Sequence, residues 1–175
     1  MAQEIIDLTD EVIMMIETME QIKNKNLIWL KDNEKKLYKK VIKQSDKIEQ
    51  DKSKEKFALE LDPKGNLNMI NRKNNKFFYK GNIFDFGDEI ANKSLKLKKV
   101  TFNGIGLGTH ITSYIKQYKP KKVLLLEKDM QIFNCSLYIT DYVELSQISK
   151  IKFDIGDKVK YTKDSDAIRL KDFLE

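Results

Sequence analysis

The sequence predicts an α/β protein with a Rossmann-like parallel sheet, preceded by a helical segment and a small β-hairpin. Three observations support this fold class. Apolar runs and helix-period segments alternate in the order β-α-β-α-β-α from residue 98 onward, which is typical of a parallel sheet with right-handed crossovers. Apolar residues recur at steps of three and four over about 4–50, without Gly or Pro. Between them, two alternating runs flank a connector containing Pro and Gly. We therefore expect a helical segment (1–56), a hairpin with a short helix (57–97) and a Rossmann-like unit (98–175).

The composition excludes several classes of protein. The 175 residues carry a formal net charge of +6, but only Arg72 and Arg169 are arginines, whereas surfaces that read phosphates or bases favour the arginine fork. We therefore do not expect nucleic acid as a partner. The single cysteine, Cys135, excludes internal disulfides, and the single histidine, His110, excludes a His-rich zinc site. No apolar run is long enough for a membrane span, and the acidic N-terminus lacks the layout of a signal peptide. The composition thus predicts a cytoplasmic protein with no membrane span and with Cys135 packed in the core.

The helical segment is expected to form two helices or one long bent helix. Asn24 and Asn26 separate two apolar sets and are predicted to mark a turn or a kink. One apolar face is a candidate contact surface for a partner or for a second copy of the chain; it includes Ile5, Leu8, Val12 and Met19.

The middle of the chain changes from helical to alternating periodicity. The runs 57–61 and 66–70 predict a hairpin, which residues 77–79 extend into a small sheet. Residues 84–95 predict a short helix that starts near Asp85 or Gly87.

The last part of the chain predicts three buried strands, over 100–102, 123–126 and 151–155, with helices between them. The continuously apolar strand runs indicate strands covered on both faces. Asp129 is expected to cap the second helix, Asp141 and Glu144 to cap a turn after it, and a final helix to run from Ser165 to Leu174.

A glycine-rich turn is the feature with the most specific chemistry. Gly104, Gly106 and Gly108 lie between the first strand and its helix, and Glu127 ends the next strand. Glycines let a backbone turn tightly and let a ligand approach, the helix N-terminus attracts anions, and the acid is placed to accept hydrogen bonds from a ribose. His110, in the first helical turn, is a candidate contact, although a partly exposed surface histidine is the simpler interpretation.

The turn does not by itself specify a ligand. The dinucleotide spacing GxGxxG is not met, and Asn103 stands where methyltransferases usually carry an acid. Two interpretations stay open. The glycines either serve only close packing of strand and helix, or they bind a nucleotide-like ligand such as a CMP-sugar or S-adenosylmethionine. No catalytic triad, carboxylate pair or metal site is predicted, so no catalytic residue is assigned.

Residues 100–157 resemble the N-terminal region of the motility accessory factor (Maf) family. The resemblance rests on a strand, the G-x-G-L-G turn at 104–108 and a helix, followed by three matching segments. It extends upstream to a lead-in over 79–88. The matching segments are 122–129, Ile132-Phe133 and Asp141-Tyr142.

The resemblance implies a role in glycosylation of bacterial flagellin. Maf proteins are proposed to transfer a nonulosonic acid from its CMP-activated form to Ser or Thr of flagellin, with catalysis in a domain after the Rossmann-like region. Members are several times longer, so we expect this chain to be an N-terminal fragment or a truncated relative, inactive alone and without a cofactor of its own. Flagellin is the implied partner, and a homo-oligomer is possible. The alternatives are an S-adenosylmethionine-dependent methyltransferase-like domain and a protein-binding or oligomerisation module.

Overall fold

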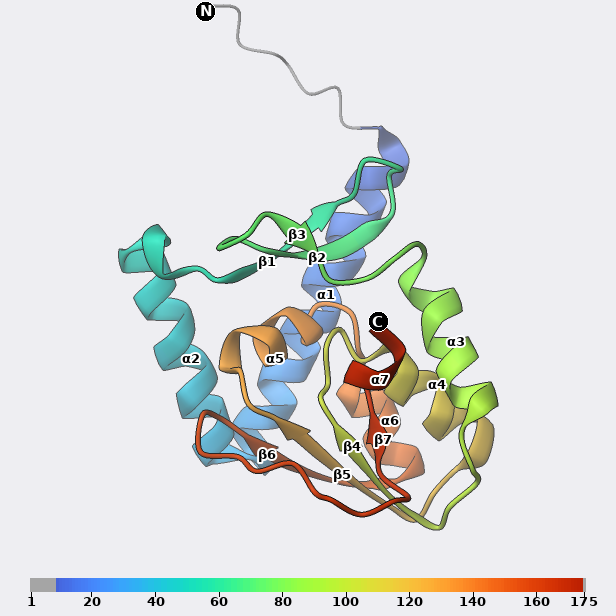
Figure 1. Cartoon of the computed structure of the whole chain (residues 1–175). Coiled ribbons are helices and arrows are strands. Elements are labelled where there is room, and N and C mark those ends of the chain that lie inside the picture. The colour runs from blue at the N-terminus through green and yellow to red at the C-terminus, as the bar shows by residue number, and fades with distance from the viewer. Residues whose placement is uncertain (1–8, 175) are drawn as a thin grey trace, which may run out of the picture.

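The computed structural model describes residues 9–174, which form two sheets and a set of helices (Figure 1). A small antiparallel sheet has the strand order β1-β2-β3, and a parallel sheet has the order β6-β5-β4-β7. In Figure 1 the parallel sheet lies along the bottom of the view, with helices α1, α4, α5 and α6 above it. The predicted combination of a helical segment, a small hairpin sheet and a parallel sheet is confirmed.

The helical segment forms two helices, α1 (Asp10–Asn33) and α2 (Lys35–Gln50), followed by the 3₁₀ turn η1 (Lys52–Lys54). The break lies at Glu34, whose φ of −134° and ψ of 57° leave the helical region. The predicted turn or kink at Asn24 and Asn26 is wrong, because both residues lie inside α1.

Asn26 instead fastens α1 to the segment around α5 and α6. Its side chain is completely buried. The amide donates to the carbonyls of Leu137 (2.8 Å) and Thr140 (2.7 Å), and the amide oxygen accepts from the Tyr142 N–H (3.0 Å). A buried amide with three partners avoids the desolvation cost that an unpaired polar group carries. The asparagine is therefore a tertiary contact rather than a helix breaker.

The small sheet follows the alternating sequence pattern. β1 (Phe57–Leu61) pairs antiparallel with β2 (Leu67–Asn71), as predicted, and β2 pairs with β3 (Lys76–Phe77). Of the predicted extension over 77–79, only Phe77 lies in β3. The next helix, α3 (Ile83–Lys93), is capped by Asn82, whose side chain accepts from two backbone N–H groups. Gly87 lies inside α3, not at its start. A Cβ there would lie 2.6 Å from the Thr109 carbonyl carbon, so the glycine lets α3 pack closely against the start of α4.

The parallel sheet contains the expected strand–helix–strand units. β4 (Lys99–Asn103) is followed by α4 (Thr109–Tyr118), then β5 (Lys122–Glu127), α5 (Met130–Ser136), α6 (Tyr142–Ile148) and β6 (Lys150–Ile155). Asp129 and Asp141 cap helices as predicted: Asp129 accepts from the Gln131 N–H and Asp141 from the Glu144 N–H. The predicted capping role of Glu144 is wrong, because Glu144 lies in the first turn of α6. Helix α5 ends at Ser136.

The predicted helix from Ser165 to Leu174 is wrong. Ile168 and Arg169 form the strand β7, which pairs in parallel with Phe102 and Asn103 of β4, and only Lys171–Leu174 are helical (α7). Buried Ile168 and Leu170 are two positions apart, which is the period of a strand. Pairing with the free edge of β4 therefore overrides the helical propensity of this segment.

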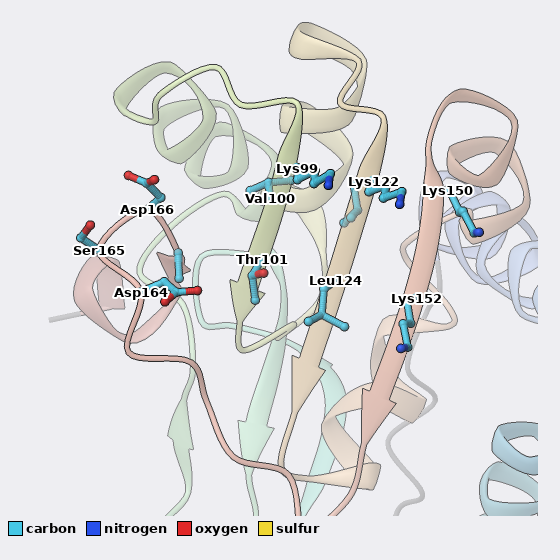
Figure 2. Close-up of a pocket in the computed structure, with 12 residues that line it drawn as sticks. Lys99, Val100, Thr101, Lys122, Leu124, Lys150, Lys152, Asp164, Ser165 and Asp166 are labelled. Atoms are coloured by element: carbon cyan, nitrogen blue, oxygen red, sulfur yellow. The ribbon is translucent and has the colours of Figure 1, made fainter.

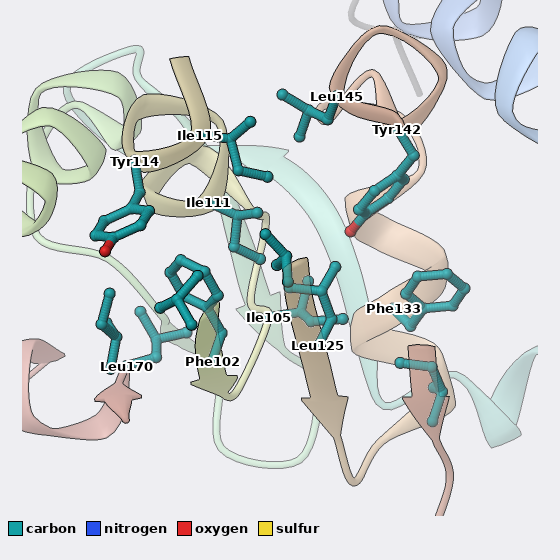
Figure 3. Packing of buried hydrophobic residues seen from close by; sticks show 14 of the residues in the cluster. Phe102, Ile105, Ile111, Tyr114, Ile115, Leu125, Phe133, Tyr142, Leu145 and Leu170 are labelled. Carbon is teal, nitrogen blue, oxygen red and sulfur yellow. The ribbon is translucent and has the colours of Figure 1, made fainter. Parts of the chain in front are cut away.

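One hydrophobic core joins the helical segment to the parallel sheet. Leu30 of α1 and Leu37 and Val41 of α2 belong to the same buried cluster as Phe102 and Leu125. Figure 3 shows Phe102, Ile105 and Leu125 beneath α4 and α6, whose side chains Ile111, Ile115, Tyr142 and Leu145 complete the packing. Cys135 is buried, as predicted, in a second cluster next to the small sheet.

The opposite face of the parallel sheet is open, so the prediction of strands covered on both faces is wrong. Thr101 and Leu124 point away from the core and are only half-buried, whereas Phe102 and Leu125 beside them are fully buried. Within residues 9–174 every crossover helix lies on the other side (Figure 1). In the same range, none of the helices combines the length and the apolar character needed to cross a membrane.

Candidate functional site

The glycine turn connects β4 to α4 through three left-handed backbone positions. Gly104 has a φ of +94°, Gly106 of +54° and Gly108 of +82°. A side chain is strained at such angles, so glycine allows the chain to reverse within a few residues. Gly108 is the N-cap residue of α4 and, lacking a side chain, supplies no capping group of its own. The turn thus has the tight shape predicted from the sequence.

The side chain of Glu127 accepts hydrogen bonds from the backbone of this turn. One carboxylate oxygen, Oε2, accepts from the N–H groups of Ile105 (2.8 Å) and Gly106 (3.4 Å), and Oε1 accepts from the Asp129 N–H (3.1 Å). The side chain is 4% exposed, and this burial raises the pKa of the carboxyl group while the three N–H groups oppose the rise. Two N–H groups that an anionic ligand would use are therefore bonded to a carboxylate of the chain itself.

Side chains from distant parts of the chain fill the space next to the glycines. A Cβ on Gly106 would collide with the Tyr79 hydroxyl and lie 2.7 Å from Leu170 Cδ2. A Cβ on Gly108 would collide with the Thr140 hydroxyl. The close approach that glycine permits is made here by the protein's own side chains.

Two of these side chains also form hydrogen bonds with the backbone of the turn. The Tyr79 hydroxyl accepts from the Leu107 N–H (2.7 Å), and the Thr140 hydroxyl donates to the Leu107 carbonyl (2.8 Å). Tyr79 is 3% exposed, and burial raises the pKa of its phenol above the ordinary range. The backbone of Leu107 is thereby fully satisfied, and three consecutive N–H groups, at 105–107, are occupied by Glu127 and Tyr79.

His110 lies beneath the turn and faces the core. It is completely buried rather than partly exposed, and its ring meets Phe102 edge-on at 5.4 Å between centroids. The Gly104 backbone lies nearby, but neither ring nitrogen has a partner with hydrogen-bond geometry among residues 9–174. Burial lowers the pKa of the imidazole to about 4, so the ring is neutral at pH 7. A neutral, enclosed ring is poorly placed to exchange protons with a ligand in solvent.

The structure therefore brings four of the five predicted residues together and places the fifth, His110, below them. The four are Gly104, Gly106, Gly108 and Glu127. Sequence reasoning missed the filling residues Tyr79, Thr140 and Leu170. Spacing gives no signal for Thr140 or Leu170. Tyr79 had one weak signal, since it opens the lead-in on which the family resemblance partly rests.

Two large surface depressions are lined by residues other than those of the glycine turn. A groove of about 670 Å³ lies on the open face of the parallel sheet. A cleft of about 570 Å³ lies between α1, α2, β1 and α5, and Met19 of the predicted contact face lines it. Of the other residues of that face, Val12 is half-buried, and Ile5 and Leu8 lie outside the described residues. Between residues 9 and 174, no group of three or more His, Cys, Asp or Glu side chains is placed to hold a metal ion.

Comparison with known proteins identifies the family. A family model described as the glycosyltransferase Maf N-terminal domain matches residues 19–160, which is well over half of the chain. The matched range contains both helices of the helical segment in large part, the small sheet, the glycine turn and β6. Neither curated proteins nor solved structures gave a match. The chain therefore belongs to the family of Maf glycosyltransferase N-terminal domains, as its glycine turn and the segments after it predicted.

Proposed function

We propose that this chain is a supporting, non-catalytic domain of a Maf-type protein that glycosylates flagellin. The parent protein would transfer a nonulosonic acid from its CMP-activated form to Ser or Thr of flagellin, and this domain would dock the acceptor or support the catalytic domain. The family match supports the glycosyltransferase context.

The non-catalytic part of the proposal rests on one observation. The consecutive N–H groups at 105–107, which would face a phosphate in a nucleotide-binding turn, are bonded to Glu127 and Tyr79. A nucleotide would have to break these buried bonds and displace Tyr79 and Leu170 before it reached the backbone. We infer that the glycine turn is a packing junction of the fold.

A transfer assay tests the proposal directly. The chain is incubated with a CMP-nonulosonic acid and purified flagellin, and transfer is followed by mass spectrometry of the flagellin. We expect no transfer by this chain alone. Transfer at the rate of an active glycosyltransferase would contradict the non-catalytic role.

Calorimetry tests the packing junction against the methyltransferase alternative. We expect no heat of binding from S-adenosylmethionine or from CMP at millimolar concentration. Glu127→Gln serves as the matched variant, because it keeps the size of the side chain but removes the carboxylate charge. Micromolar binding by the wild type that is lost in Glu127→Gln would show that Glu127 serves a ligand, and would overturn the inference.

A further inference from the structure

The open face of the parallel sheet carries a broad groove with a positive floor. The groove of about 670 Å³ extends over β4, β5 and β6 and is bounded by the segment at 164–167. Figure 2 shows Lys99, Lys122 and Lys150 side by side near the start of the three strands, with Lys152 further along β6. Thr101 and Leu124 lie between the lysines and the bounding segment and give the floor a small apolar centre.

The strand register places three like charges next to one another. Lys99 pairs in register with Lys122, which pairs with Lys150. Like charges on directly neighbouring positions destabilise a sheet. Among the described residues, none of these three lysines and no atom of Lys152 takes part in an ion pair. An acidic ligand on this face would therefore reduce the repulsion between the lysines.

The dimensions of the face suit one helix. Neighbouring strands are about 4.8 Å apart, so the three spacings from β6 to β7 span roughly 14 Å, and an α-helix with its side chains is about 10–12 Å wide. A crossover helix between β6 and β7 would ordinarily cover this face, but residues 156–167 cross without one. The half-buried Leu124 is the apolar contact that such a helix would cover.

The far edge of the groove favours a polypeptide over a nucleic acid. Asp164 and Asp166 border the groove opposite the lysines (Figure 2). The two aspartates would repel a uniformly charged phosphate backbone. A helix with one acidic stripe and one aliphatic stripe can instead place its acids against the lysines and its aliphatic residues against Leu124, without contacting the aspartates. We propose that this face binds an acidic amphipathic helix of a separate partner protein. The proposal does not depend on the proposed function.

A peptide-binding experiment on the whole chain tests this docking surface. The probe is a fluorescein-labelled 18-residue helical peptide with Glu on one stripe and Leu on the next, and fluorescence anisotropy is measured at low salt. The same peptide with Lys in place of Glu is the control ligand. We expect saturable binding of the Glu peptide only, weakened by about tenfold or more in the double variant Lys122→Glu, Lys150→Glu.

Matched variants separate the surface from general charge and from misfolding. Lys36→Glu with Lys39→Glu makes the same charge change on exposed positions of α2 and is expected to bind like the wild type. Leu124→Ser removes the apolar centre and is expected to weaken binding severalfold, and circular dichroism checks that each variant is folded.

Four outcomes would overturn the proposal. They are absence of binding of the Glu peptide, equal binding of the Lys peptide, equal loss in the α2 variant, and tighter binding of a single-stranded RNA than of the peptide. Light scattering adds a fifth. A wild-type dimer that dissociates in the Lys122→Glu, Lys150→Glu variant would show that a second copy of the chain occupies the face. A second copy is the principal competing occupant, because the first turn of its α1 is acidic.

Discussion

Buried His110 is expected to make the folded state less stable as the solution is acidified. The imidazole has an ordinary pKa of 6.5 and, in the folded protein, a pKa of about 4 because of burial. Between these values the unfolded chain binds a proton that the folded chain excludes, so protonation favours unfolding. The contribution of neutral His110 to the free energy of unfolding is therefore fully present well above pH 6.5 and is lost progressively as the pH falls toward 4.

The size of the effect follows from the same two values. They differ by about 2.5 pH units, and each unit corresponds to about 1.4 kcal/mol, so His110 alone removes about 3 kcal/mol between pH 7 and pH 4. Small domains have a total free energy of unfolding of about 5–15 kcal/mol, so this loss is large enough to measure.

Urea unfolding at several pH values between 7 and 4 tests this effect. The single tryptophan, Trp29, packs edge-on against Phe153 at 6.2 Å and reports loss of the core by fluorescence. The His110→Leu variant removes the titrating ring at similar volume, and other titrating groups are shared with the wild type. The difference in free energy of unfolding between wild type and variant should therefore change by about 3 kcal/mol over this range.

The control substitution lies on the same helix. Gln117→Leu changes an exposed uncharged residue and should keep the pH dependence of the wild type. Identical pH profiles for His110→Leu and the wild type would refute the reasoning, because they would mean that the folded protein protonates His110 as readily as the unfolded chain does.

Three further predictions concern buried contacts, and chemical denaturation measures each. Gly106→Ala should destabilise the fold by about 3 kcal/mol or more, because its Cβ meets Tyr79 and Leu170; Gly65→Ala, at a φ of +83° with open space around it, should cost only about 1–2 kcal/mol, and equal losses would contradict the close packing. Tyr79→Phe should cost about 1–3 kcal/mol by leaving the Leu107 N–H without its partner, and an unchanged stability would mean that this bond is absent. Asn26→Leu should cost about 3 kcal/mol or more, since three buried backbone groups lose their partner; a smaller loss would count against that network.

Local patterns were sufficient to predict most of the fold. The Pro and Gly connector at 62–65 predicted the hairpin, and the order of strands and helices predicted the parallel sheet. The errors arose where distant contacts decide the local structure. Residues 168–170 have a helix-compatible composition, but a free edge of β4 makes them a strand, and Asn26 resembles a helix breaker until its three partners are seen.

The candidate site divides in the same way. The shape of the turn and the position of Glu127 follow from spacing along one strand–turn–helix–strand unit. The residues that fill it do not, because Tyr79 comes from the lead-in to α3 and Leu170 follows β7. The burial of His110 also depends on packing of α4 over β4, which no single-residue pattern predicts. That the turn binds no nucleotide-like ligand stays a prediction, which calorimetry tests.

The bonds of Asn26 also constrain how the protein can assemble during its own synthesis. Leu137 and Thr140, which receive its amide hydrogens, leave the ribosome 111 and 114 residues later. Until residues 137–142 have emerged, the Asn26 amide is hydrated, and the bonds that join α1 to this segment contribute nothing to the free energy of folding. Slower elongation would therefore prolong the interval in which a chaperone can hold this helix.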